Sequence, residues 1–281
     1  MKTVVFDIGG TAVKYGVFAE DAVLFDQFPV RDADGNEHLP TRLCDIAKQL
    51  GANRIVISAP GPFDFENGTG QMRHKLPSLY GVSLRERFAA ALPDVSVDFV
   101  HDLTAFAAGA LAEYPDLRDT AFACVTLGTG LGYVFVQDGK AQLNDRQTPL
   151  HPLWNQPYED GICEDYVSAA AFLREAETCG FSFDSVKALD VAAETELALQ
   201  AVFDTVGKHL GECVNLACAR DPFSCVVIGG QISRSWDRMR AAFAAVCDLP
   251  CRTVQDPATC ALYGLNAIAK QGKDVFGTIT T

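Results

Sequence analysis

The feature that most constrains this chain is a turn rich in glycine and threonine between two β-like runs, because the chain contains it twice. In the first copy, Val4–Phe18, two apolar runs flank Gly9-Gly10-Thr11. In the second copy, Cys124–Val136, similar runs flank Gly128-Thr129-Gly130. Glycines can adopt positive φ and bring the backbone close to a ligand, and successive amides at such a turn can point at an anion. Two such hairpins in one chain indicate a duplicated architecture.

Three side chains around the first turn carry the chemistry that a nucleoside triphosphate needs. Thr11 supplies a hydroxyl, Lys14 supplies a cation, and Asp7 supplies a carboxylate suited to Mg²⁺ held through water. Taken alone, the turn is explained equally well as an ordinary Gly-Gly hairpin. The second copy favours a nucleotide bound between two related lobes, with one hairpin from each lobe at its phosphates.

Asp102 stands where a predicted strand, Val95–Val100, meets a predicted helix, His101–Leu111. Asp is a favoured residue at a helix N-cap, which is one explanation for its presence. The same position lies at the carboxyl end of a strand, where open α/β sheets collect their ligands, and the amides of a helix start favour a negative charge. Both explanations can hold at once, so Asp102 is a candidate site residue.

Two further segments with glycine follow buried strands. Arg54–Ser58 is typical of a strand, and it ends in the rigid turn Ala59–Pro62, which contains Gly61. This position favours a ligand contact, and a plain strand-to-loop turn explains it equally well. The run Ser224–Ser233 is a predicted buried strand that ends in Gly229-Gly230 ahead of a helix. A planar base or a ribose could lie there against bare backbone.

Hydrophobic periodicity predicts most of the remaining elements. We expect a strand at 22–30 and helices at 39–50, 83–92, 166–178, 194–218 and 258–270. The expected apolar stripe of helix 166–178 consists of Tyr166, Ala170 and Leu173. Phe63–Tyr80 contains several glycines and prolines and little periodicity, so we expect a long surface loop there, the usual place for specificity.

Composition limits the class of protein. The 281 residues are 48% hydrophobic, which is enough for one large or two medium domains with substantial cores. The net charge of −13 and the lack of a basic patch argue against nucleic acid or an anionic membrane as a partner. The ten cysteines lack the close paired spacing of a zinc site, so we expect reduced core residues in a cytoplasmic protein. No secretory signal is visible, and no apolar run approaches the roughly 20 residues that span a bilayer.

Taken in order, the motifs resemble those of the actin-like ATPase and sugar kinase superfamily. The amino-acid sequences of both hairpins resemble those of its ROK family. The two hairpins correspond to the phosphate-1 and phosphate-2 motifs, and Gly229-Gly230 corresponds to the adenosine motif. The resemblance implies an α/β fold of two related actin-like, ribonuclease H-like lobes with a nucleotide cleft between them. It implies an N-terminal lobe at 1–115 and a C-terminal lobe at 116–281, with the last helix packing back at the lobe interface.

The resemblance also implies a function. It predicts a cytoplasmic homodimer that uses ATP and Mg²⁺ to phosphorylate a sugar hydroxyl, namely the primary hydroxyl of a hexose or a close derivative. Asp102 corresponds to the general base of the related kinases. The expected sugar contacts besides Asp102 are Gly61, His101, His151 and Glu164. Glu164 matches through the Tyr-x-Ser that follows it, and His151 matches by position only.

The chain departs from the family's pattern at three places. Related kinases carry a Cys-x-Cys-Gly-x-x-Gly-Cys zinc cluster that orients the histidine, whereas this chain has Cys163 alone. A structural zinc needs about four protein ligands, so we predict no zinc site. His101 replaces an asparagine before the base, and Lys75 stands near the place of another. We expect these two residues and His151–Glu164 to set sugar selectivity. Glu164→Ala should then raise the sugar KM and leave the ATP KM nearly unchanged.

Other classes of protein must be weighed against a kinase. A repressor of the same family would need a DNA-binding extension, and the first motif begins at Val4, which leaves no room for a helix-turn-helix before it. A non-catalytic sugar or nucleotide sensor would account for the missing zinc cluster. An ATPase without a sugar acceptor would also keep both hairpins. The presence of Asp102 together with both hairpins favours the kinase.

Overall fold

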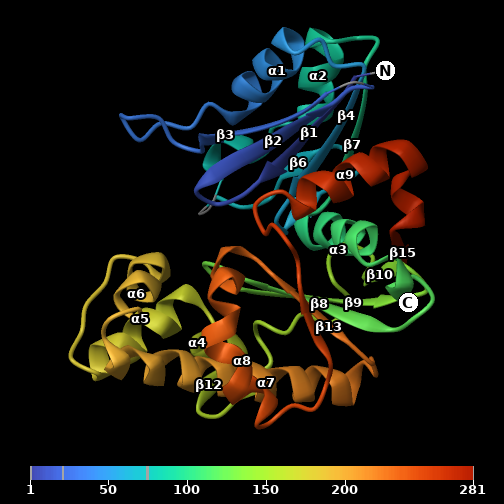
Figure 1. Ribbon diagram of the computed structural model, residues 1–281. Helices are drawn as coiled ribbons and strands as arrows, with labels where there is room; N and C mark the ends of the chain where they lie inside the picture. Colours follow the sequence, from blue (N-terminus) through green and yellow to red (C-terminus); the bar gives the residue numbers. More distant parts are fainter. Residues whose placement is uncertain (1, 21, 74–75, 281) are drawn as a thin grey trace. The chain divides into compact units, whose positions relative to one another are not determined.

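The computed structural model describes residues 2–20, 22–73 and 76–280 and divides the chain into two compact units. Unit 1 is formed by Met1–Asp116, Gly139–Leu150 and Thr259–Thr281, and unit 2 by Leu117–Asp138 and His151–Ala258. Figure 1 shows the course of the chain through their elements. Each unit has strands, helices and an apolar core of its own, so the expected α/β fold with two lobes is confirmed.

The sheet of unit 1 is built on the first hairpin. Its strands are β1 (Thr3–Ile8), β2 (Ala12–Phe18), β3 (Val23–Pro29), β4 (Arg54–Ala59) and β7 (Ser96–His101), in the order β3-β2-β1-β4-β7. Strand β2 is antiparallel to β1 and β3, whereas β1, β4 and β7 are parallel. The carboxyl ends of these three strands lie at one edge of the sheet. The residues that follow β1, β4 and β7 are therefore neighbours.

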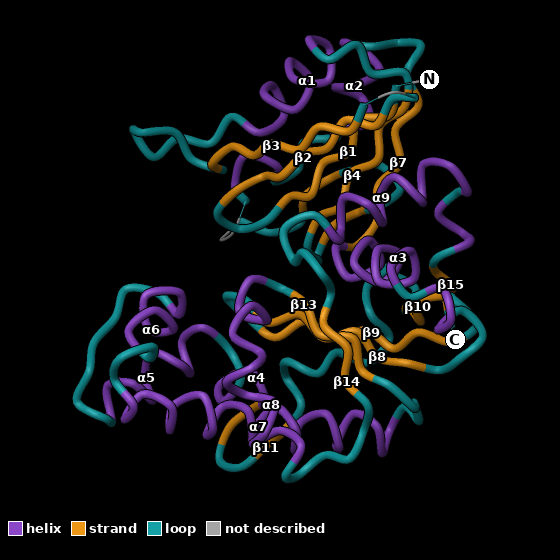
Figure 2. The backbone as a smooth tube through the Cα atoms, in the orientation of Figure 1, coloured by secondary structure: helices purple, strands orange, loops and turns teal. Residues whose placement is uncertain are grey.

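Helices cover both faces of this sheet, as Figure 2 shows. One face carries α1 (Leu39–Gln49) and α2 (Leu84–Ala91), and the other carries α3 (Asp102–Glu113) and α9 (Cys260–Gln271). Successive side chains of a strand point to opposite faces. Phe6 and Ile8 therefore join the core with α1 and α2, whereas Asp7, between them, points to the side of α3 and α9.

Helix α9 belongs to unit 1, although it lies near the end of the sequence, because it packs closely on α3. Two glycines permit this approach. A Cβ on Gly109 would lie 2.1 Å from the carbonyl oxygen of Cys260, and a Cβ on Gly264 would lie 1.9 Å from that of Ala105. Any larger residue at either position would separate the two helices.

Short elements complete unit 1. Strand β10 (Lys140–Leu143) pairs in parallel with β15 (Gly277–Ile279). Strands β5 (Phe63–Asp64) and β6 (Thr69–Gly70) form a small antiparallel pair. The 3₁₀ turns are η1 (Pro77–Leu79) and η5 (Lys273–Val275), and η2 (Pro115–Leu117) lies where unit 1 gives way to unit 2. Both units are thus discontinuous in sequence, whereas the sequence predicts one boundary after residue 115.

The sheet of unit 2 repeats the arrangement around the second hairpin. Strand β8 (Phe122–Leu127) is antiparallel to β9 (Leu131–Gln137) and parallel to β13 (Val226–Gly229), which is parallel to β14 (Cys251–Thr253). In unit 1 the order β2-β1-β4-β7 has the same pattern of a hairpin followed by two parallel strands. The duplicated architecture that the two turns predict is therefore present.

The helices of unit 2 are α4 (Cys163–Tyr166), α5 (Ala169–Thr178), α6 (Val186–Ala192), α7 (Gln200–Arg220) and α8 (Trp236–Ala244). The short strands β11 (Pro157–Tyr158) and β12 (Gly161–Ile162) and the turns η3 (Leu197–Leu199) and η4 (Gln231–Ser235) complete this unit. Helix α7 crosses the core of the unit and packs on α8, where a Cβ on Gly207 would lie 2.7 Å from the carbonyl oxygen of Met239.

The prediction of a long surface loop at Phe63–Tyr80 is wrong. Within its described part, Phe63, Phe65, Met72 and Leu79 are buried in the core of unit 1. The segment lacks helical or alternating periodicity because it crosses the core as two very short strands and a 3₁₀ turn. Its apolar residues, and not its glycines and prolines, decide where it lies.

Two helix predictions need correction. The expected helix 166–178 is broken at Val167 and Ser168, and the hydroxyl of Ser168 accepts a hydrogen bond from Ala171 N and begins α5 anew. The buried stripe of α5 is Ala171, Phe172 and Ala176, whereas Ala170 is exposed. The expected helix 194–218 begins only at Gln200. Leu197, which lies within the expected helix, is 83% exposed.

The ten cysteines are free. Most are buried, as expected, but Cys179 at the end of α5 is exposed, and Cys218 and Cys251 are half-buried. The expectation that all ten are core residues is therefore wrong for Cys179. None of the described helices combines the length and the apolar character that crossing a membrane requires.

Candidate active site

The first hairpin presents open backbone at its tip. Gly9 N donates to the carbonyl oxygen of Ala12 at 3.1 Å, and a Cβ on Gly9 would lie 2.9 Å from that oxygen. A Cβ on Gly10 would meet nothing within 4 Å, and Thr11 is exposed. Neither glycine has positive φ, so the close turn, and not an unusual backbone conformation, requires Gly9. Gly10 leaves room for a ligand.

Asp7 lies on β1 in register with Lys14 of β2 and Ser58 of β4. The buried Ser58 Oγ donates to Asp7 Oδ1 at 2.7 Å. Burial raises the pKa of the Asp7 carboxyl, and the charge of Asp102 raises it further, whereas the Ser58 hydrogen bond and the charge of Lys14 lower it. A cation at Asp7 would relieve the cost of burying this negative charge.

The sequence contained no sign that Ser58 would be the partner of Asp7, because only the register of two parallel strands brings the two residues together. A serine just before a strand end is too common to be a signal. The parallel pairing itself was foreseeable only as a consequence of the fold class.

Asp102 is the first residue of α3, and the cap is His101, so the prediction of Asp102 as the N-cap is wrong by one residue. Leu103 N donates to Asp102 Oδ1 at 2.7 Å, and His101 Nδ1 lies 2.8 Å from the same oxygen and 3.2 Å from Leu103 N. The two shorter distances favour a proton on His101 Nδ1 that is donated to Asp102. Asp102 Oδ1 then has two donors, and Oδ2 has no protein partner among the described residues.

Gly61 lies directly beside His101. A Cβ on Gly61 would lie 2.9 Å from Thr148 Cγ2 and 3.5 Å from His101 Nε2. The side chain of His101 is almost fully buried, whereas that of Asp102 is 39% exposed. The turn after β4 is therefore part of the surroundings of Asp102. Thr148 was missed because it reaches this place from a distant part of the sequence.

The second hairpin also has one open and one tight glycine. A Cβ on Gly128 would meet nothing within 4 Å, whereas a Cβ on Gly130 would lie 2.3 Å from Glu164 Oε2. The same oxygen accepts a hydrogen bond from Leu131 N at 2.8 Å. Thr129 between the two glycines is exposed. Glu164 therefore supports the hairpin, a role that the sequence did not indicate.

The segment His151–Glu164 is held together by its own backbone. Glu164 N donates to the carbonyl oxygen of Trp154 at 3.0 Å, and Cys163 N donates to that of Gln156 at 3.0 Å. His151 lies at the start of this segment, with its Nδ1 2.8 Å from Asp221 Oδ1. The structure thus joins His151 and Glu164 in one hydrogen-bonded segment of unit 2.

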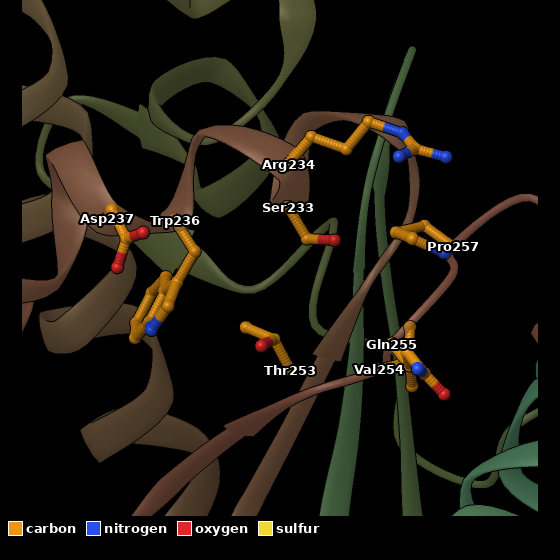
Figure 3. A pocket seen from close by; sticks show the side chains of 8 residues that line it. All are labelled: Ser233, Arg234, Trp236, Asp237, Thr253, Val254, Gln255 and Pro257. Carbon is orange, nitrogen blue, oxygen red and sulfur yellow. The ribbon is translucent and has the colours of Figure 1, made fainter.

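The second glycine of the pair Gly229-Gly230, which follows the end of β13 at Gly229, has a structural reason. Gly230 has φ of 80°, and a Cβ on it would lie 2.2 Å from the carbonyl oxygen of Leu127, the last residue of β8. Beyond Gly229 and Gly230, a hollow lies at the carboxyl ends of β13 and β14, where Figure 3 shows Ser233 and Thr253 on facing walls. Arg234 at its rim pairs with Asp256 at 2.7 Å.

Each unit thus gathers its own share of the predicted residues. Unit 1 holds Asp7, Gly9, Gly10, Thr11, Lys14, Gly61, His101 and Asp102, and unit 2 holds Gly128, Thr129, Gly130, His151, Glu164, Gly229 and Gly230. Lys75 lies outside the described residues. Among the described residues, no group of three or more His, Cys, Asp and Glu side chains could hold a metal ion. The lack of a zinc site stays a prediction.

No family model matches the chain. The beta-glucoside kinase of Listeria monocytogenes is 30% identical over 144 residues, which are 50% of this chain and 48% of that protein. The N-acetyl-D-glucosamine kinase of Vibrio parahaemolyticus is 25% identical over 256 residues, which are 81% and 83% of the two chains. The chain spans about half the length of the beta-glucoside kinases from Listeria that it matches.

A solved structure matches over nearly the whole chain. It is a ROK family glucokinase from Streptomyces griseus in complex with glucose and AMPPNP, with a TM-score of 0.78 and 19% identity over 97% of this chain and 100% of that one. At this level of identity, the likeness concerns the fold.

Proposed function

We propose that this chain, whose fold is that of the ROK family sugar kinases, transfers the terminal phosphoryl group of ATP to a hydroxyl of a sugar. The observation that carries the proposal is the geometry of Asp102. Its Oδ1 is occupied by Leu103 N and His101 Nδ1, which orients the carboxylate and leaves Oδ2 without a protein partner among the described residues. A general base needs such an oriented carboxylate with one oxygen open to the proton it accepts.

In this mechanism Asp102 Oδ2 accepts the proton of the sugar hydroxyl as the hydroxyl oxygen attacks the terminal phosphorus of ATP. The bond from that phosphorus to its bridging oxygen breaks, and ADP leaves. The position of Asp102 at the start of α3 favours a negative charge, because the first amides of a helix have no acceptor within it. His101 fixes the rotation of the carboxylate. Catalysis of phosphoryl transfer depends mainly on such positioning and on stabilisation of charge.

The phosphates of ATP would lie at the two hairpins, where Gly10 and Gly128 leave open backbone and Thr11 and Thr129 are exposed. Lys14 would supply positive charge. Mg²⁺ fits Asp7, because this ion is usually held by one or two carboxylates, several waters and the substrate's phosphates. When bound, it would neutralise charge on the phosphates. Gly229 and Gly230 would bound the site of the nucleoside.

The acceptor would be a hexose or a close derivative that presents its primary hydroxyl to Asp102. The residues that would contact the sugar are Gly61, His101, His151 and Glu164. Support comes from the names of the similar proteins, which are kinases for beta-glucosides, N-acetyl-D-glucosamine and glucose. Each sugar hydroxyl without a partner in a desolvated site would cost about 1–3 kcal/mol, so these side chains would decide which sugar binds.

A panel of sugars tests the proposal against its alternatives. Turnover of Mg·ATP is measured alone and with glucose, N-acetylglucosamine, N-acetylmannosamine and a β-glucoside, and the product is identified by mass. A kinase shows sugar-dependent release of ADP matched by sugar phosphate. Release of ADP at the same rate without any sugar would favour an ATPase, and binding of sugar or ATP without turnover would favour a sensor.

We also propose that the protein acts as a cytoplasmic homodimer without nucleic-acid or membrane partners. The net charge of −13 supports the lack of nucleic-acid and membrane partners, and the free cysteines support a reducing compartment. The dimer is what the resemblance to the ROK family implies. Light scattering after size-exclusion chromatography in a reducing buffer would measure the mass. A mass of a single chain at micromolar concentration would contradict the dimer.

A further inference from the structure

A buried polar cluster at the end of α7 lies against one side of His151. Asp221 follows the last residue of α7, and its side chain is 6% exposed. Its Oδ1 lies 2.8 Å from His151 Nδ1, and its Oδ2 accepts from Tyr133 OH at 3.0 Å and from Arg220 Nε at 3.2 Å. Both carboxylate oxygens therefore have partners. The positive charge of Arg220 compensates the buried negative charge of Asp221.

Arg220 also fixes the backbone on which His151 stands. Its Nη2 donates to the carbonyl oxygen of His151, and its Nη1 donates to Gln156 Oε1, both at 3.2 Å. The guanidinium thus bridges Asp221 and the segment that leads to Glu164. A rigid fork of donors suits this task, because one side chain can bind several oxygens in fixed directions.

The cluster determines the protonation of the His151 ring. A carboxylate only accepts hydrogen bonds, so the ring nitrogen that faces Asp221 must carry the proton. The neutral ring then has its lone pair on Nε2. The side chain of His151 is 43% exposed, and Nε2 has no protein partner among the described residues. Burial and the charge of Asp221 raise the pKa of Tyr133, so Tyr133 stays a donor in the cluster.

We infer that Asp221 is a positioning residue that holds His151 in the Nδ1–H tautomer, with Nε2 directed outward to accept a hydrogen bond from a hydroxyl of the acceptor sugar. The inference rests on the proposed function for the identity of the ligand. In related kinases a zinc cluster orients the histidine, and here a carboxylate binds the same ring directly. A carboxylate behind a histidine is a common way to fix both the tautomer and the orientation of the ring.

The first test needs no substrate. Long-range ¹H–¹⁵N correlation spectra of the ¹⁵N-histidine-labelled protein at about pH 8.5, above the ordinary histidine pKa of about 6.5, report the tautomer of each neutral ring. The His151→Ala variant identifies the signal of His151. We expect the Nδ1–H tautomer, and the Nε2–H tautomer would overturn the inference even if the protein proves to be a sugar kinase. If no sugar is phosphorylated, the proposed function fails, and this spectrum still decides what Asp221 does to the ring.

The second test is a double-mutant cycle on the accepted sugar. Asp221→Asn and His151→Ala should each raise the sugar KM about tenfold and leave the ATP KM unchanged. Tenfold is a usual scale for losing a residue that orients a ligand-binding side chain. Because Asp221 acts through His151, Asp221→Asn should change nothing further in the His151→Ala background. Multiplied effects in the double variant would overturn the inference.

A matched control separates positioning from simple stabilisation. Tyr133→Phe removes one hydrogen bond from the other oxygen of the same carboxylate and leaves the contact with His151 in place. It should lower the melting temperature and leave the sugar KM unchanged. If Tyr133→Phe and Asp221→Asn raise the sugar KM in proportion to their loss of stability, Asp221 is structural and the inference is wrong.

Discussion

The two hairpins have the same outline and are held in place in different ways. In the first, the tight glycine, Gly9, faces the carbonyl oxygen of Ala12 within its own turn. In the second, the tight glycine, Gly130, faces the carboxylate of Glu164, which comes from a later helix. The first turn is therefore closed by its own backbone. The second has its own hydrogen bond, from Gly128 N to the carbonyl oxygen of Gly130 at 3.2 Å, and in addition the distant side chain of Glu164.

The charges around the hairpins also differ. Asp7 on β1 lies in register with Lys14 and Ser58, so the first hairpin has ionisable groups on the strands themselves. At the equivalent place on β8, Thr126 lies in register with Gly229. The comparison teaches that a shared turn pattern predicts the outline of a hairpin and does not predict which charged groups lie beside it. We propose that the first hairpin serves the metal and the reaction, and that the second serves binding alone.

The largest effect is expected next to the first hairpin, at Asp102. Asp102→Asn keeps an oxygen for Leu103 N and removes the base, so turnover should fall by about two orders of magnitude while folding and ATP binding persist. Steady-state turnover and the melting temperature are the measurements. Asp98→Asn is the matched control, because Asp98 lies on β7, the strand that leads to Asp102, and pairs with Arg54. Near-normal turnover of Asp102→Asn would remove Asp102 from the reaction.

The next largest effect is the loss of stability when a methyl group is added to each tight glycine. Gly9→Ala and Gly130→Ala should each cost about 1–3 kcal/mol of unfolding free energy, since both added methyl groups meet atoms closer than contact distance. The obstacle to Gly130→Ala is a side chain, so adding Glu164→Ala should remove the clash and make the two changes less than additive. No side-chain change should rescue Gly9→Ala. Denaturant titration measures the unfolding free energy of Gly9→Ala, Gly130→Ala, Glu164→Ala and the double variant.

Gly10→Ala and Gly128→Ala are the controls for these variants. Both glycines have open space where a Cβ would lie, so stability should stay within about 0.5 kcal/mol of wild type. If the open backbone faces phosphates, the ATP KM should rise in both. An unchanged ATP KM in both variants would mean that the hairpins do not bind ATP.

A smaller effect sharpens the role of Glu164. The sequence predicts that Glu164→Ala changes only the sugar KM, whereas the hydrogen bond from Leu131 N predicts that the ATP KM rises as well, by up to about tenfold. Glu164→Gln keeps an oxygen for Leu131 N, so its ATP KM should remain near that of wild type while its sugar KM rises. If Glu164→Ala leaves the ATP KM unchanged, the contact with the hairpin has no role in ATP binding.

The smallest effect concerns stability at Asp7. Burial raises the pKa of Asp7, so its contribution to stability is present below the ordinary Asp pKa of about 3.9 and is lost as the pH rises through the folded value. At pH 7 the buried charge is therefore unfavourable, and Asp7→Asn should stabilise the free protein by about 0.5–2 kcal/mol. Thermal unfolding without ligand measures this gain.

Added Mg·ATP should make wild type more stable than Asp7→Asn, because in the proposed function the Asp7 carboxylate holds the ion. Asp26→Asn is the control of opposite sign. The hydrogen bond from the backbone of Gln27, followed by that from the Tyr15 hydroxyl, lowers the pKa of Asp26, so this variant should gain no stability at pH 7. A less stable Asp7→Asn protein without ligand would contradict the proposed cost of burial.

The sequence by itself determined the fold class and the order of the motifs. Both hairpins, the strand before Asp102 and the run ending at Gly229 appear in the structure within a residue or two of their predicted bounds. The resemblance to the ROK family sugar kinases is confirmed at the level of the fold. These predictions succeed because turns, strand alternation and helix starts depend on residues that are close together in the chain.

The tertiary structure alone decided what surrounds each motif. It placed Phe65 in the core, Thr148 against Gly61, and Glu164 against Gly130. It also placed Asp221 behind His151, a contact between residues that are 70 positions apart. No local pattern encodes such neighbours, because they depend on which strands pair and which helices pack together. Burial and hydrogen-bond partners then set the charge, tautomer and orientation of each side chain, and these follow from the fold as a whole.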